Sequence, residues 1–136
     1  MALKYSVTVR NAKLDAIETA IGTSAILKIR TGSAPANCAA ADSGTVLSTV
    51  NLPSDWLAAA SSGAKSKSGT WEDTSADATG TAAHFRVYDS GGLTCHVQGT
   101  ITTVAVGTGD MLVDNDNFAA GQNFTVSSFT ITAGNA

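Results

Sequence analysis

Residues 69–101, GTWEDTSADATGTAAHFRVYDSGGLTCHVQGTI, decide the fold because they contain a clear β-hairpin pattern. Two segments of β-branched and aromatic residues flank the turn-forming residues 90–92. A three-residue loop at 90–92 would pair Val87 with Cys95 and Phe85 with Val97. This pairing keeps one face of the hairpin apolar, so the pattern predicts this register.

The register places each chemical group of the hairpin on one of its two faces. Cys95 falls on the apolar face, which predicts a buried and unreactive thiol rather than a nucleophile. The polar face would carry His84, Arg86, Tyr88 and His96. We therefore interpret the hairpin as structural, with a polar face that is available as a contact surface.

The remaining segments predict a mainly β protein. Short β-branched or aromatic segments recur along the chain, and Gly, Asn, Asp, Ser or Pro bounds each of them. We expect about seven strands, within residues 24–32, 45–53, 70–75, 81–89, 93–106, 110–114 and 123–133. Strands of this kind indicate an antiparallel β-sandwich with a jelly-roll-like arrangement, and the 136 residues fit one domain, 1–136.

One α-helix is expected at residues 6–21. It would form an N-terminal helical segment, 1–22, that packs on the sandwich or extends from it. Ser6 or Thr8 can cap its first turn, and Gly22 can end it. Its apolar stripe would consist of Val7, Leu14, Ile17 and Ile21.

Several local features can be predicted beyond these elements. In the last strand, 124–132, the apolar residues change phase across Ser127 and Ser128, which predicts a β-bulge. Residues 33–44 show no periodicity and are expected as a loop. Residues 54–60 start with a capping residue before helix formers, which predicts a short helix with Trp56 as a core anchor. Residues 61–69 contain two lysines and are expected as a flexible, solvent-facing tip.

The composition excludes several classes of partner. Charged residues make up only 14% of the chain, whereas small and hydroxylated residues are abundant, which favours close packing against other protein. The net charge is −3 and the basic residues are scattered, so we expect no nucleic-acid binding. No apolar run is long enough to span a membrane, and the N-terminus lacks the pattern of a signal peptide. We therefore expect synthesis in a cytoplasm, with Cys38 and Cys95 as free thiols.

No pattern of reactive residues predicts catalysis or a metal site. The two histidines of the hairpin lack a third ligand at suitable spacing, and Arg86 between them would repel a cation. The acidic segment 110–117 does not fit a calcium loop, because Phe118 and Ala119 stand where an oxygen ligand and glycine are needed. We expect a protein that is not an enzyme and that has no catalytic residues, no metal and no cofactor.

Three parts of the sequence resemble a known family. They are the helix YSVTVRNAKLDAIETAIG (5–22), the motif LPSDW (52–56), and the segment that contains GTWED (69–73) and GTAAHFR (80–86). Together they resemble small virion structural proteins of tailed phages and prophages, in particular the capsid cement, or decoration, proteins. The resemblance covers essentially the whole chain. It implies a jelly-roll sandwich that sits as a dimer on the outside of the capsid lattice.

The resemblance, together with the low charge, predicts a structural protein on the capsid surface of a virion. Its partners would be the major capsid protein and further copies of itself, in a dimer or trimer. Apart from the loop 33–44, the candidate contact residues are Val7, Arg10, Leu14, Ile17, Trp71, Arg86, Tyr88 and His96. The alternatives are a tail-associated or fibre-associated virion protein and a carbohydrate-binding sandwich with Trp71 and Tyr88 as its platform.

Overall fold

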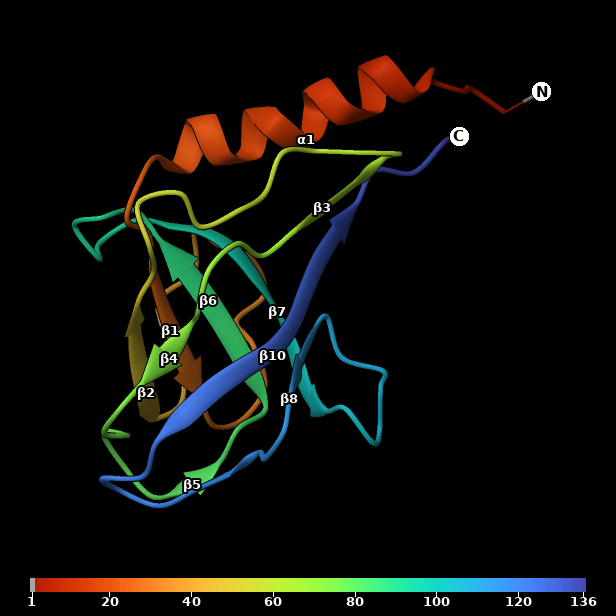
Figure 1. Ribbon diagram of the computed structural model, residues 1–136. Coiled ribbons are helices and arrows are strands. Elements are labelled where there is room, and N and C mark those ends of the chain that lie inside the picture. Colours follow the sequence, from red (N-terminus) through yellow and green to blue (C-terminus); the bar gives the residue numbers. More distant parts are fainter. Residues whose placement is uncertain (1) are drawn as a thin grey trace.

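The computed structural model describes residues 2–136, and Met1 lies outside them. Helix α1 (Val7–Ile21) lies across one end of the strands (Figure 1). The Ser6 side chain accepts a hydrogen bond from the Val9 N–H (3.3 Å) at its first turn, and Gly22 follows its last residue with φ of 90°. Both ends of the predicted helix are therefore confirmed, with Ser6 rather than Thr8 as the cap.

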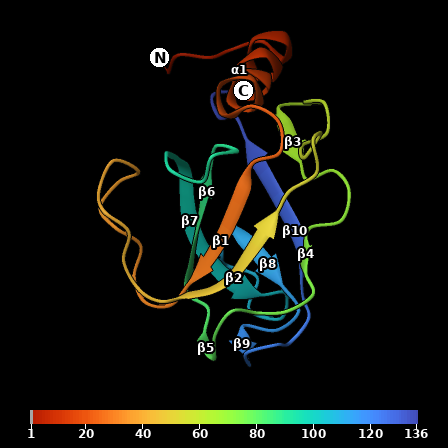
Figure 2. The same ribbon diagram turned by 90° about the vertical axis from the view of Figure 1, so that its left-hand side faces the viewer.

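The strands form one curled sheet with a small two-stranded sheet beside it (Figures 1 and 2). The order in the large sheet is β2-β1-β6-β7-β8-β10-β3, with β4 paired to β10, while β5 pairs with β9. The bounds are β1 (Ile26–Arg30), β2 (Val46–Asn51), β3 (Ala64–Ser66), β4 (Glu72–Asp73), β5 (Gly80–Thr81), β6 (His84–Tyr88), β7 (Cys95–Thr103), β8 (Met111–Val113), β9 (Asn117–Phe118) and β10 (Phe124–Thr132).

The prediction of a mainly β chain with one N-terminal helix is confirmed. The wholly antiparallel arrangement is wrong at one place, because β7 and β8 run parallel. The segment between these two strands reverses direction before β8 joins the sheet. The residues of β8 alone therefore do not indicate in which direction the strand runs. The sheet curls into a half-barrel, and neither a two-layer sandwich nor a jelly roll is confirmed.

The concave side of the sheet encloses the apolar core. Both tryptophans lie in it, with their ring centroids 6.0 Å apart, and Trp71 contacts Phe129 at 5.6 Å. Phe85 packs edge-on against Phe129 at 5.5 Å. Trp56 is 1% exposed and donates its indole N–H to the carbonyl of Gly22 (2.9 Å), so its predicted role as a core anchor is confirmed.

Residues 54–69 differ from both predictions made for them. Residues 54–60 form no helix, and residues 64–66 form strand β3 on the edge of β10 instead of a flexible tip. Lys65 is 2% exposed, and its ammonium group lies 2.8 Å from Asp15 and 2.9 Å from Glu18 of α1. Two carboxylates from a distant part of the sequence thus compensate the burial of this lysine.

The last strand follows its prediction closely. β10 spans Phe124–Thr132, and its pairing with β8 shifts between Val126 and Ser128. The apolar side chains on both sides of this shift, Val126 and Phe129, are buried. The bulge lets both side chains reach the core, which confirms the prediction from their change of phase.

The predicted register of the β6–β7 hairpin is wrong. Val87 pairs with Val97 rather than Cys95, and Tyr88 pairs with Cys95 across a shift in register. Leu93 and Thr94 stay in the turn, where Leu93 is 89% exposed. The bulge rotates Cys95 to the side of Tyr88, so its thiol lies on the outer face of the sheet instead of in the core.

Candidate functional site

The outer face of β1 and β6 carries a row of basic and aromatic side chains. The register pairs Ile26 with Tyr88, Lys28 with Arg86 and Arg30 with His84. Since alternate residues of a strand point to opposite faces, these pairs lie on the face away from Phe85 and Val87 of the core. The Lys28 ammonium group lies 5.0 Å from the centre of the Tyr88 ring.

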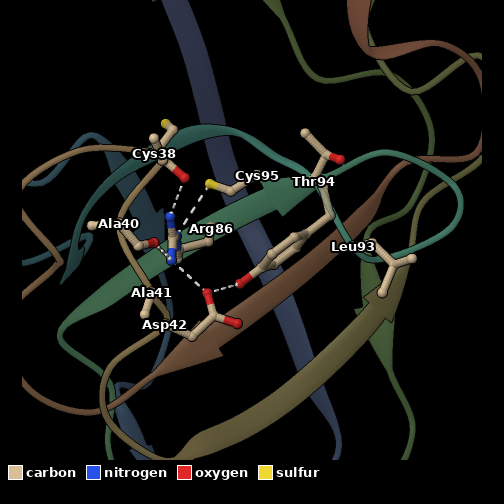
Figure 3. Close-up of a pocket in the computed structure, with 10 residues that line it drawn as sticks. Cys38, Ala40, Ala41, Asp42, Arg86, Leu93, Thr94 and Cys95 are labelled. Carbon is tan, nitrogen blue, oxygen red and sulfur yellow. Dashed lines mark hydrogen bonds and ion pairs between the residues drawn. The ribbon is translucent and has the colours of Figure 1, made fainter.

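The loop 33–44, which we call the covering loop, folds over this face (Figure 2). Its Asp42 carboxylate accepts hydrogen bonds from Arg86 (2.5 Å), Tyr88 (2.5 Å) and Arg30 (2.9 Å). Figure 3 shows the Asp42 carboxylate directed toward the Arg86 guanidinium group. One carboxylate of the loop therefore joins three side chains of the sheet.

Arg86 holds the covering loop through its main chain as well. Its guanidinium group donates to the carbonyls of Cys38 (2.7 Å), Ala40 (3.2 Å) and Asn37 (3.4 Å). Its Nε–H donates to the Cys95 sulfur at 3.1 Å. Arg86 is only 1% exposed, so its charge is separated from water and compensated by the loop.

A second contact fastens the other end of the loop. His84 is 1% exposed, and its Nδ1 lies 2.6 Å from the carbonyl of Gly32, so that nitrogen carries the proton. The Gln98 side-chain amide donates to the carbonyl of Pro35 (2.7 Å). The loop is thus held along most of its length by side chains of β1, β6 and β7.

These contacts shift the pKa values of the cluster. Burial would raise the pKa of Asp42, but the Tyr88 hydrogen bond and the charges of Arg30 and Arg86 outweigh it and hold that pKa below its ordinary 3.8. Burial and the Asp42 carboxylate raise the pKa of Tyr88 to about 12. The cluster is therefore in its charged, hydrogen-bonded form at neutral pH, with Tyr88 as a donor.

A partly open cavity of about 540 Å³ lies beside the cluster. Its lining includes the loop residues 38–42 and the sheet side chains of Arg86, Tyr88 and Cys95 (Figure 3). Arg86 and Tyr88 already donate to the loop, so their polar groups serve to hold it. The thiols of Cys38 and Cys95 are the reactive groups that remain at the cavity.

The structure separates the eight candidate contact residues into two groups. Val7 and His96 are exposed, and Arg10 and Ile17 are half-buried. The four buried residues are Leu14, Trp71, Arg86 and Tyr88. These four side chains cannot touch a partner directly. They can affect a contact only by positioning the exposed residues that cover them.

The sequence pattern missed the burial of the polar hairpin face. His84 and Arg86 were expected near His96 on an open surface, but the covering loop buries the first two, while His96 stays exposed. The sequence does contain a feature that indicates the burial of this face. Arg30 and Arg86 fall on the same face of neighbouring strands and need a compensating charge, and Asp42 is the carboxylate in the loop that follows the first strand.

Over residues 2–136, the structure shows no group of three or more potential metal ligands. Within the same range, no helix has the length and apolar character needed to cross a bilayer. No family model, curated protein or solved structure matches this chain.

Proposed function

We propose that this chain is a non-enzymatic structural protein of a tailed-phage virion, a capsid decoration protein that bridges neighbouring capsomers. The observation that carries the proposal is the covering loop, a surface of small residues that is held rigidly on the sheet. The resemblance of the helix and of the LPSDW and GTWED motifs to phage cement proteins supports the same function. The major capsid protein would be the partner, on the outside of the head.

The covering loop has the properties of a preorganised contact surface. Its exposed side chains are mostly small: Ser33, Ala36, Asn37, Ala39 and Ala41. Small side chains lose little rotamer freedom on binding, and the loop backbone is already ordered by Arg86 and Asp42. Such a surface can be buried against a neighbouring protein at low entropic cost.

The N-terminal helix offers a second surface. Val7 and Val9 are 49% and 43% exposed, while Leu14 and Ile21 on the other side are buried. The outer face of the helix is therefore available to a capsomer or to another copy of the chain in a dimer or trimer. The jelly-roll relationship implied by the resemblance stays part of this proposal, and the binding surfaces do not depend on it.

The structure bears differently on the two alternative functions. A carbohydrate platform of Trp71 and Tyr88 is wrong, because these side chains are 0% and 2% exposed and cannot stack on a sugar. A tail-associated or fibre-associated protein would use the same kind of packing surface and differs in copy number and symmetry. The ratio of this chain to the major capsid protein therefore separates the two virion functions.

The first test is the copy number in purified virions, measured by quantitative mass spectrometry against the major capsid protein. A simple lattice fraction, such as equal numbers of both proteins, is the expected result. A few copies per particle would place the chain at the tail or at one vertex. Complete absence from the particle would overturn the virion function.

The second test probes the covering loop directly. Ala39→Arg adds a long charged side chain to the exposed loop surface, and we expect it to abolish binding to capsids that lack this protein. Ala120→Arg makes the same change at an exposed alanine far along the sequence and should bind normally. Equal capsid binding by both variants, with unchanged thermal stability, would remove the loop from the interface.

A further inference from the structure

The two cysteines of the chain lie in the wall of the cavity beside Arg86, close enough for the Cys38 side chain to affect the pKa of the Cys95 thiol. Cys38 lies in the covering loop and Cys95 begins β7, and both line the cavity. Arg86 touches both residues, through the Cys95 sulfur at 3.1 Å and the Cys38 carbonyl at 2.7 Å. Figure 3 shows their side chains next to each other above the guanidinium group.

We propose that Cys38 and Cys95 form an oxidation site, in which a small-molecule disulfide converts the two thiols into one intramolecular disulfide. The bond would join the covering loop covalently to the sheet that it covers. This inference concerns the chemistry of the chain itself and stands whether or not the chain decorates a capsid.

The surroundings of both thiols suit this reaction. Both cysteines are free and only half-buried, and the cavity beside them is open to solvent, so a small oxidant can reach them. Burial raises the pKa of the Cys95 thiol, the Arg86 guanidinium group lowers it, and the adjacent Cys38 side chain raises it again. The net effect is a raised pKa, so the reaction should be slow at neutral pH and faster in mild alkali.

The reaction is two successive thiol–disulfide exchanges. The thiolate of one cysteine attacks a sulfur of oxidised glutathione, forms a mixed disulfide and releases one glutathione. The second cysteine then attacks the protein sulfur of the mixed disulfide and releases the other glutathione. The two protein thiols lose two protons and two electrons, and one glutathione disulfide becomes two glutathione thiols.

The position of the loop favours the intramolecular disulfide as the product of the reaction. The covering loop is already fixed beside β7 by Asp42, Arg86 and Gln98, so the second thiol is present at high effective concentration. The disulfide links positions far apart in sequence and thus restricts the unfolded chain. We expect the midpoint of thermal unfolding to rise by about 10 °C.

The test treats the purified chain with excess oxidised glutathione at pH 8 and measures intact mass, thiol content and thermal unfolding. We expect both thiols to disappear while the intact mass shows no glutathione attached to the protein. The unfolding midpoint should rise, and dithiothreitol should reverse this rise. Cys38→Ser should instead gain one glutathione at Cys95 and show no such rise, and Cys95→Ser should behave in the same way at Cys38.

Three results would overturn the inference. Stable addition of one glutathione to each cysteine would mean that the sulfurs cannot meet in the folded chain. Disulfide-linked dimers as the main product would mean that the thiols react between chains. Retention of both thiols after prolonged treatment would mean that the site is closed to oxidants.

Discussion

The Asp42 carboxylate compensates two buried arginines at once. Its side chain is 40% exposed, whereas the side chains of Arg30 and Arg86 are 7% and 1% exposed. A buried cation that loses its partner destabilises a fold strongly, because water cannot replace the lost carboxylate. The partial exposure of Asp42 moderates this effect, because solvent beside the carboxylate already screens its charge.

We therefore expect Asp42→Asn to lower the free energy of unfolding by about 2 kcal/mol. The asparagine keeps the shape of the side chain and can still accept from Tyr88, but its negative charge is gone. Urea unfolding at pH 7 measures the difference. Asp114→Asn is the control at an exposed carboxylate, where a change within about 0.5 kcal/mol is expected. Equal stability of the two variants would show that the arginines do not need Asp42.

The same carboxylate should make stability depend on pH. The folded protein holds the pKa of Asp42 below its ordinary 3.8, so folding favours the ionised form. Its contribution is complete above that value and is lost as the pH falls from 3.8 through the lower pKa of the folded state. The difference in stability between wild type and Asp42→Asn should thus be constant near neutrality and shrink in acid. A difference that instead grows below pH 4 would contradict the assignment of a lowered pKa.

Lys65 is a buried cation that two carboxylates of the helix α1 compensate. β3 would be a short edge strand with little apolar surface, yet its lysine reaches Asp15 and Glu18 of α1. The same segment also donates the backbone N–H groups of Ala60 and Gly63 to Asp15 and Asn11 of the helix. These polar contacts with residues 60–65 therefore add to the packing of Leu14 and Ile21 in fixing the helix on the half-barrel.

We expect Lys65→Ala to lower the free energy of unfolding by about 2–3 kcal/mol, because it removes both ion pairs and the packed stem of the lysine. Amide hydrogen exchange should accelerate first in α1. Lys67→Ala, two residues further along and half-buried, is the matched control and should leave exchange in α1 unchanged. Equal acceleration in both variants would show that α1 does not depend on the Lys65 ion pairs.

The end of the covering loop depends on a glycine. Gly44 has φ of 71°, and a Cβ atom there would lie 2.0 Å from the Thr31 carbonyl oxygen, so the backbone would have to move. Gly121 has a similar φ of 82° but open space around its Cα. Gly44→Ala should lower stability by about 3 kcal/mol or more, and Gly121→Ala by about 1 kcal/mol. Thermal unfolding measures the stability of both variants. Similar losses of stability would mean that the positive φ, and not the close approach to Thr31, determines the effect at Gly44.

The elements that the sequence predicted well are those that local interactions determine. The bounds of α1 follow from Ser6 and Gly22, and the bulge of β10 follows from its own alternation of apolar residues. The hairpin register and the burial of Lys65 depend on partners far away in the chain. The covering loop itself was predicted as a loop, but its docking on Arg86 needs knowledge of which strands are neighbours. The candidate site was therefore the least predictable part of the structure.

The distribution of these contacts bears on how the fold unfolds. The apolar core forms one continuous cluster that includes Ile21 of α1, Trp56 and Trp71, and Phe129 of β10. The helix, the middle segment and the last strand thus share one set of packed side chains, and none can leave without exposing part of it. The covering loop lies outside this cluster, on the opposite face of the sheet, and polar contacts hold it.

We accordingly expect urea unfolding to be a single cooperative transition for the helix and the sheet. Tryptophan fluorescence, which reports on the core, and far-ultraviolet circular dichroism, which reports strongly on α1, should give the same midpoint. In Asp42→Asn the two midpoints should fall together, because the loop stabilises the sheet that carries the core. A circular dichroism midpoint below that of fluorescence in the wild type would mean that α1 unfolds on its own. The polar contacts at Lys65, rather than the shared core, would then limit the stability of the helix.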